Sequence, residues 1–178
     1  MPSLQKLTSL PAVDHPELLG APVAAALKSW PHADRVAVVE IDPDLADTAA
    51  MSEAYDVPLE ASANCVVVMG RRAGEERSAA CVVRADTRAD VNSLVKRTLD
   101  VRKCSFLDHD RAVAETGMEY GGITPVGLPE AWRLMLDSRV VDIEVAVIGS
   151  GVRSSKLLLP GALLAELPGA EVVPDLAR

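Results

Sequence analysis

Two apolar runs near the middle of the chain restrict its fold more than any other feature. Asn64–Met69 (NCVVVM) and Ala79–Val83 (AACVV) are rich in β-branched residues, and the charged, turn-like stretch Gly70–Arg77 (GRRAGEER) lies between them. This pattern predicts a β-hairpin with a long charged loop. Because a hairpin joins antiparallel strands, it excludes a purely parallel sheet.

Helix and strand patterns alternate through the rest of the chain. Apolar spacing and helix-start signals predict helices over Pro16–Trp30, Asp42–Tyr55, Asp90–Leu99, Asp108–Glu115 and Ala162–Leu167. Apolar runs predict further strands over Arg35–Ile41, Lys103–Leu107, Arg133–Leu136, Ile143–Ile148, Lys156–Leu159 and Ala170–Val173. We therefore expect an α/β (mixed α+β) fold in which helices pack against a mixed β-sheet.

Length and composition indicate one domain with an aliphatic core. A chain of 178 residues with 49% apolar residues is long enough to bury a substantial core, so we expect a single domain over residues 1–178. Aromatic residues make up only 3%, which argues against a protein that stacks single-stranded nucleic acid on aromatic side chains. The N-terminus lacks the apolar core of a signal peptide, and no apolar run approaches the ~20 residues that span a bilayer. We expect a cytoplasmic protein with neither a membrane nor DNA as its partner.

The net charge of −8 conceals a basic segment. Arg71–Lys103 contains nine basic and five acidic residues, a net of +4, which leaves −12 for the remainder. Such a segment could face the phosphates of a nucleic acid. The alternative is that these side chains are scattered over a solvated surface.

Several standard catalytic or metal sites are absent from the sequence. The three histidines have no metal-binding spacing, and the three cysteines, Cys65, Cys81 and Cys104, contain no CxxC pair. The chain has no GxSxG elbow, no Walker loop and no GxGxxG fingerprint. Asp42 and Asp44 are better explained as caps at a helix start than as an acid–base pair. We therefore predict no metal, no cofactor and no covalent nucleophile.

The stretch Thr116–Pro129 (TGMEYGGITPVGLP) holds four of the eleven glycines and two of the twelve prolines. Within it, Gly121–Pro125 should form a rigid turn with exposed backbone amides. Such amides suit an anion, or a carbonyl oxygen that becomes negative when an ester reacts with water. The alternative is an ordinary connection between a helix and a strand.

GGITPVG resembles the Gly-x-x-x-Pro loop of the YbaK/prolyl-tRNA-synthetase-associated domain family. Other segments resemble that family in the same order along the chain. They are DPDLADTAAMSEAYDVP, ASANCVVVMG, AACVVRADTRADVNSLVKRTLDV, LMLDSRVV and AVIGSGVRSSKLLLPGALL. The similarity covers a core from about residue 41 to residue 167 and leaves residues 1–34 as an N-terminal helical extension.

The resemblance implies an aminoacyl-tRNA deacylase that acts in trans, with mischarged aminoacyl-tRNA as its substrate and an aminoacyl-tRNA synthetase as a further partner. It implies a mixed β-sheet, partly closed on itself and surrounded by helices. The loop formed by Gly121, Gly122, Ile123, Thr124 and Pro125 would hold the acyl group and ribose. Water would be the nucleophile, without a metal or cofactor.

One position departs from the family pattern. Many members have a lysine that faces the substrate at the start of the first core strand, where this chain has Asn64. Asparagine donates and accepts hydrogen bonds but carries no charge. Either Asn64 still orients the ester or a water, or the protein is a non-catalytic module that binds aminoacyl-tRNA or an amino acid. A third alternative is that Asn64 only satisfies the local backbone.

The resemblance suggests further site residues. Asp137 would bind the substrate amino group, although it could instead cap a short helix. Gly149 and Ser150 would line the opposite side of the pocket, although they could form a simple turn. Arg71 and Arg72, in the basic segment, would contact the tRNA.

Overall fold

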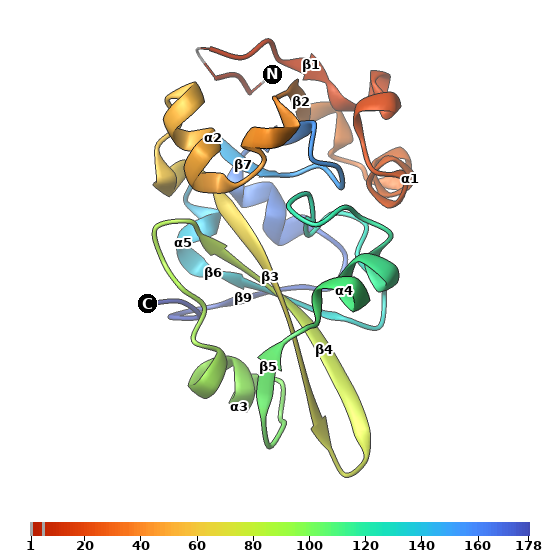
Figure 1. Cartoon of the computed structure of the whole chain (residues 1–178), viewed down its shortest axis with the longest axis vertical. Helices are drawn as coiled ribbons and strands as arrows, with labels where there is room; N and C mark the ends of the chain where they lie inside the picture. Colours follow the sequence, from red (N-terminus) through yellow and green to blue (C-terminus); the bar gives the residue numbers. More distant parts are fainter. Residues whose placement is uncertain (1, 5) are drawn as a thin grey trace.

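The strands form two β-sheets in the computed structural model, which describes residues 2–4 and 6–178 (Figure 1). The first sheet is antiparallel and has the order β1 (Leu10–Pro11), β2 (Ala37–Glu40), β8 (Ser155–Leu159) and β7 (Ala146–Gly149). The second has the order β5 (Cys104–Phe106), β3 (Ala63–Arg72), β4 (Glu75–Arg84), β6 (Arg133–Asp137) and β9 (Ala170–Val173).

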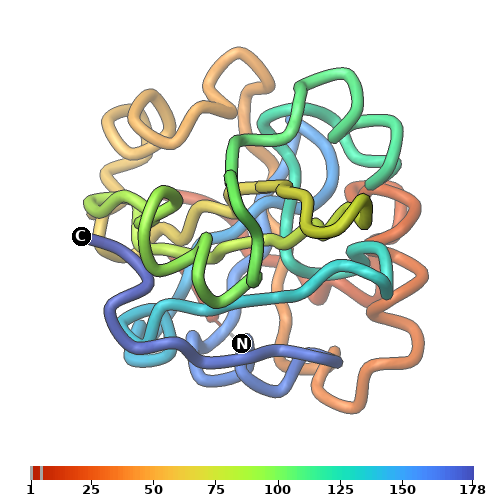
Figure 2. Tube along the Cα trace, turned by 90° about the horizontal axis from the view of Figure 1, so that it is seen from below, coloured from red at the N-terminus to blue at the C-terminus, as the bar shows by residue number. Residues whose placement is uncertain are grey.

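The second sheet is mixed, because β4, β6 and β9 run parallel whereas β3 is antiparallel to β4 and β5. Figure 2, viewed from below, shows β6 and β9 side by side along one edge of this sheet. The predicted mixed α/β fold is confirmed. The expectation of one partly closed sheet was wrong, since the strands are divided between two open sheets.

The predicted β3–β4 hairpin is present, but its loop is short. The two strands stay paired from Ala63–Arg84 to Arg72–Glu75, so only Ala73 and Gly74 form the turn. Both turn residues have positive φ, +51° and +84°, as in the tight turns that suit twisted strands. The prediction of a long charged loop was wrong, because most of Gly70–Arg77 extends the strands.

Short helices connect the strands. They are α1 (Ala21–Ser29), α2 (Thr48–Tyr55), α3 (Lys96–Thr98), α4 (His109–Thr116) and α5 (Ser138–Val141). A π-helical turn, Val91–Val95, precedes α3, and 3-10 turns lie at Ala12–Asp14, Pro16–Leu18, Ala33–Arg35, Pro43–Leu45, Leu59–Ala61 and Gly161–Glu166. The helix predicted over Ala162–Leu167 is therefore a 3-10 turn, and those predicted over Pro16–Trp30 and Asp42–Tyr55 each divide into a 3-10 turn and an α-helix. Among the helices in the described part of the chain, none is long and apolar enough to cross a membrane.

Aliphatic side chains fill the space between the two sheets. One buried cluster joins Val23 and Leu27 of α1 to Leu157 of β8 and Leu136 of β6. Residues before position 35 thus pack on the core, and β1 pairs with β2. At one end of this interface an isolated parallel bridge between Ser62 and Val147 brings the start of β3 against β7. The two sheets therefore meet directly at this point.

Candidate functional site

A cavity of about 320 Å³ lies where the two sheets meet. Five segments line it: the start of α2 with the residues before it, the start of β3, the loop after α4, the end of β7, and β8. The lining residues are Ala46, Asp47, Thr48, Met51, Ser62, Ala63, Asn64, Cys65, Val66, Tyr120, Gly121, Ile123, Val147, Ile148, Gly149 and Lys156. The structure thus brings Asn64, Gly121, Ile123 and Gly149, four residues that the sequence singled out, around one cavity.

The glycine loop is held by close backbone packing. A Cβ atom on Gly122 would lie 2.5 Å from the carbonyl oxygen of Val152, and Gly121 has a φ of +87°. The Gly122 amide donates to the carbonyl of Glu119 at 2.9 Å, and the Gly122 carbonyl accepts from the Gly151 amide at 2.8 Å. No acceptor among residues 2–4 and 6–178 receives the amides of Gly121 or Ile123. Two backbone donors of this loop are therefore left for a ligand.

Of the five residues of the predicted loop, Gly122, Thr124 and Pro125 do not line this cavity. Thr124 is fully buried, and its hydroxyl has no hydrogen-bond partner in the described part of the chain. Pro125 lines a separate cavity of about 490 Å³, together with Trp30 and Trp132. Thr124 and Pro125 therefore lie on the side of the loop that faces away from the 320 Å³ cavity.

Asn64 faces the cavity from the start of β3. Its side-chain carbonyl accepts a hydrogen bond of 2.8 Å from the Thr48 hydroxyl, at the start of α2. The side-chain amide of Asn64 has no acceptor among the residues that the structure describes. The bond to Thr48 fixes the side chain, so two N–H donors are left for a ligand.

Lys156 is a charged cavity residue that the sequence analysis did not single out. It projects from β8, opposite Gly149 of β7, and only 6% of its surface is exposed. Its ammonium donates to the carbonyls of Ala46 at 2.9 Å and Gly121 at 3.3 Å. Burial, together with the nearby positive charge of Arg153, lowers the pKa of Lys156 to about 8 against the opposing effect of Asp47. The signal in the sequence was a single lysine directly before a run of three leucines (SSKLLLP).

Cys65 also lines the cavity but is not an activated nucleophile. Burial raises the pKa of its thiol, and the neighbouring Cys81 adds to this rise. A reactive cysteine needs a lowered pKa, so Cys65 stays a neutral thiol at physiological pH. No group of three potential ligands in the described residues is arranged to hold a metal ion.

Asp137 lies outside the cavity. Its carboxylate caps α5, pairs with the Arg139 guanidinium at 2.8 Å and accepts from the Ala177 amide at 2.9 Å. Burial alone would raise the pKa of Asp137, but these hydrogen bonds outweigh burial and lower it. The alternative that Asp137 caps a short helix is confirmed.

Of the pair Gly149 and Ser150, only the glycine lines the cavity. The Ser150 side chain is fully buried, and its hydroxyl donates to the Ser155 carbonyl at 3.0 Å and accepts from the Ser155 hydroxyl at 2.7 Å. Ser150 therefore stabilises the turn between β7 and β8, which in turn supports the glycine loop.

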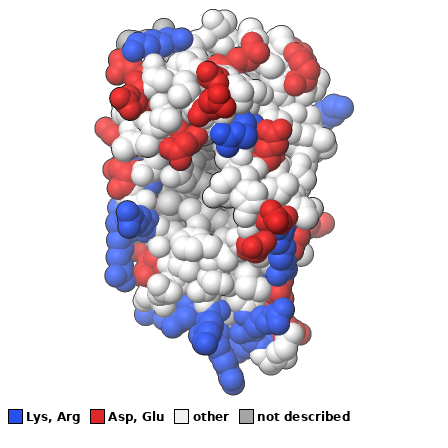
Figure 3. Space-filling view, in the orientation of Figure 1, with Lys and Arg blue, Asp and Glu red and all other residues white. Residues whose placement is uncertain are grey.

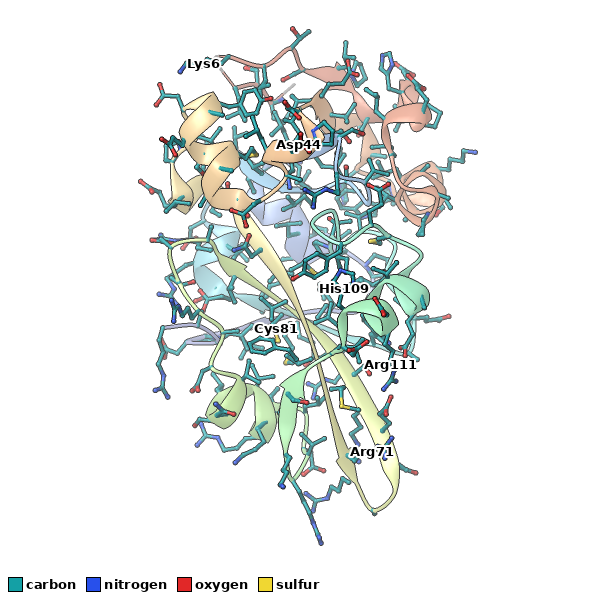
Figure 4. All side chains as sticks on the ribbon, in the orientation of Figure 1. Lys6, Asp44, Arg71, Cys81, His109 and Arg111 are labelled. Atoms are coloured by element: carbon teal, nitrogen blue, oxygen red, sulfur yellow. The ribbon has the colours of Figure 1, made fainter. Side chains whose placement is uncertain are left out.

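Arg71 and Arg72 lie near the far end of the hairpin. Arg72 is eight residues beyond Asn64 along β3, a distance of about 26 Å in an extended strand. Arg71 forms an ion pair of 3.3 Å with Glu76, and Arg72 pairs with Asp100. Arg102 lies beside them, lining the same surface depression. Figure 3 shows basic side chains gathered at this end of the molecule, where Figure 4 labels Arg71.

The sequence matches the family description "Aminoacyl-tRNA editing domain" over residues 42–167. It is 29% identical over 109 residues to a proline–tRNA ligase of Listeria monocytogenes serotype 4a (strain HCC23), and 28% identical to that of serotype 4b (strain F2365). Each match covers 61% of this chain but only 18% of the ligase.

Two solved structures are similar in fold. One is a candidate trans-editing enzyme for prolyl tRNA synthetase, with a TM-score of 0.74 and 19% identity, over 87% of this chain and 94% of the other. The second is a hypothetical protein, APE2540, with a TM-score of 0.69 and 23% identity, over 79% and 90% of the two chains. The family match spans most of the sequence and contains both the glycine loop and every wall of the cavity, so this chain belongs to the aminoacyl-tRNA editing domain family.

Proposed function

We propose that this protein is a deacylase acting in trans on mischarged aminoacyl-tRNA. Water adds to the ester carbonyl, the bond between the acyl carbon and the ribose oxygen breaks, and that oxygen receives a proton from the water. The products are the free amino acid and the tRNA hydroxyl. The observation that supports this proposal is a cavity beside two loop amides, at Gly121 and Ile123, that have no acceptor in the described part of the chain.

In this proposal the two amides bind the acyl oxygen and stabilise its negative charge as water adds. Backbone donors aimed at such an oxygen are each worth about 10²–10³ in rate. The Asn64 amide orients the ester or the water, because Thr48 already holds its carbonyl side. Water is the nucleophile in this proposal, and Cys65 forms no covalent intermediate because its thiol is neutral.

The proposed partner is aminoacyl-tRNA, and we place the reaction in the cytoplasm. Arg71 and Arg72 would contact phosphates of the tRNA about 26 Å from the cavity. The curated relatives are proline–tRNA ligases, which makes an aminoacyl-tRNA synthetase a reasonable second partner to test.

Incubation with a panel of mischarged tRNAs, with ester loss followed over time, tests the proposal. We expect hydrolysis of at least one mischarged species and strong losses in Gly121→Ala and Asn64→Ala. The alanine at 121 is strained by the φ of +87° and approaches the Arg153 guanidinium at 2.7 Å. Absence of hydrolysis above background for every tRNA would eliminate the deacylase.

The uncharged Asn64 also favours a second candidate, a module that binds aminoacyl-tRNA without cleaving it. Such a module would protect the ester from spontaneous hydrolysis, whereas a deacylase shortens its lifetime. Measuring ester hydrolysis by the Asn64→Lys variant distinguishes the deacylase from the binding module further. Hydrolysis that appears only in this variant would identify the wild-type chain as a binder.

A further inference from the structure

Lys156 occupies an unusual position for a lysine. It is the second residue of β8, whose other residues, Ser155 and Leu157–Leu159, are all buried, and only 6% of Lys156 is exposed. Lysine is rarely buried this far unless a carboxylate pairs with it, because removing an ammonium from water is costly. The position therefore calls for a physical reason.

The partners of the ammonium do not neutralise it. Two of its three N–H groups are used, one on the Ala46 carbonyl and one on the Gly121 carbonyl. Within the described residues no carboxylate lies at ion-pair distance, and no acceptor receives the third N–H. The other ionisable groups around it are Asp47, before α2, Arg153, in the turn between β7 and β8, Cys65 of β3 and Tyr120 of the loop. A positive charge with a free donor therefore borders the cavity.

We propose that Lys156 is a catalytic residue of this site, whose third N–H binds the acyl oxygen of the substrate together with the amides of Gly121 and Ile123. This proposal rests on the deacylase function. The ammonium stays protonated throughout and forms no bond with the substrate. It stabilises the negative oxygen that forms when water adds, and its bond to the Gly121 carbonyl keeps it beside the loop amides.

The electrostatics support this role. A group with a pKa of about 8 remains predominantly protonated at neutral pH, by about ten to one at pH 7. The nearby Arg153 and the burial both strengthen the attraction between this cavity and a negative oxygen. The uncharged Asn64 opposite supplies hydrogen bonds only.

Steady-state kinetics of Lys156→Met and Lys156→Arg test the proposal on whichever mischarged tRNA the wild type hydrolyses. We expect kcat to fall about 100-fold in Lys156→Met, with a smaller change in KM. Lys156→Arg, which keeps the charge, should retain more activity than Lys156→Met. Lys28→Met, a change at an exposed lysine of α1, is the matched control and should leave both constants unchanged. Unaltered kcat in a folded Lys156→Met protein would overturn the proposal.

The pH profile separates a direct role from a structural one. With background hydrolysis subtracted, the wild-type rate should decline above pH 8 as the ammonium loses its proton. This decline should be missing in Lys156→Met and shifted to higher pH in Lys156→Arg. A wild-type rate that does not fall between pH 8 and 9.5 would overturn the proposal.

Binding of 3′-amide analogues of alanyl- and prolyl-adenosine, which cannot be hydrolysed, distinguishes this inference from the proposed function. If the wild type binds an analogue but cleaves no ester, the proposed deacylase function is wrong. In that case, weaker binding of the analogue by Lys156→Met would still support contact between Lys156 and the acyl oxygen. Should Lys156→Met not fold, the Nζ of Lys156 is titrated by NMR in the wild type with and without analogue. Bound analogue should shift its pKa, and an unchanged titration would overturn the proposed contact.

Discussion

Gly149 and Gly122 lie so close together that a Cβ atom on Gly149 would be 2.4 Å from the Gly122 carbonyl oxygen. The same hypothetical atom would lie 2.8 Å from the carbonyl oxygen of Ile123. Because a real Cβ atom is essentially never this close to backbone, the loop can sit against β7 only if position 149 is glycine. The position of the Gly121 and Ile123 amides is thus set by a residue of the opposite cavity wall.

Gly149→Ala should therefore displace the loop. We expect a loss of about 1–3 kcal/mol in the free energy of unfolding, as for other overpacked sites. Deacylation should fall by about 100-fold, because a misplacement of ~1 Å has this effect on a reacting geometry. Gly169→Ala is the control, since it is strained by a φ of +74° but meets no atom within 4 Å. It should lose stability alone, and equal activity losses in both variants would contradict the prediction.

Stability should increase with pH because of Lys156. Its pKa is lowered from 10.5 to about 8 in the folded protein, mainly by burial, so the unfolded chain holds this proton to higher pH. The free energy of unfolding therefore rises between pH 8 and 10.5, by roughly 3 kcal/mol relative to a variant without the amine. Urea unfolding of wild type and Lys156→Met from pH 7 to 10 measures this difference in the free energy of unfolding. Parallel plots of unfolding free energy against pH for the two proteins would contradict the prediction.

Asp137→Asn should destabilise the fold without affecting the reaction. The carboxylate is 1% exposed and holds Arg139 and the Ala177 amide, so its loss should cost about 2 kcal/mol. Since the pKa of Asp137 lies below its ordinary value, this contribution is present at neutral pH and is lost as the pH falls through the acid range. Chemical unfolding at pH 7 and at pH 3, with deacylation at pH 7, checks both statements. A selective loss of activity would show that Asp137 acts at the site.

Charge reversal at the hairpin should weaken tRNA binding but leave catalysis intact. In Arg71→Glu/Arg72→Glu, we expect affinity to fall and the slope of log affinity against log salt to decrease by about two. The value of kcat at saturating tRNA should remain unchanged, because the cavity is about 26 Å away. Lys28→Glu on α1, which changes the net charge by −2 against −4 for the double variant, tests how much a charge reversal away from the hairpin weakens binding. A salt dependence identical to wild type would place the tRNA contact elsewhere.

The positions of the two hairpin strands were predictable from the sequence, but their full length and the length of the turn between them were not. Periodicity located β3 and β4 correctly, but the charged letters of Gly70–Arg77 resembled a loop. These residues instead extend the two strands, where Arg71 lies opposite Glu76 and Arg72 lies opposite Glu75, and the turn is confined to Ala73 and Gly74. Local composition does not reveal this cross-strand pairing.

The candidate site was predictable in part. The glycines predicted the loop, because few other residues adopt a φ of +87° such as that of Gly121. Asn64 was predictable because it lies on a strand with a clear apolar pattern. The roles of Lys156 and Asp137 depend on which face of a strand looks into the cavity and on partners distant in sequence. Asp137, for example, is satisfied by Ala177, forty residues later.

The cavity lies beside the bridge between Ser62 and Val147, and residues of both sheets form its walls. Its width consequently depends on how far the two layers are held apart by the aliphatic residues packed between them. Selection for a larger or smaller amino acid can therefore act on interior side chains that never touch the substrate. Under the proposed function, we expect relatives with identical loops but different interior side chains to differ in the amino acid that they remove.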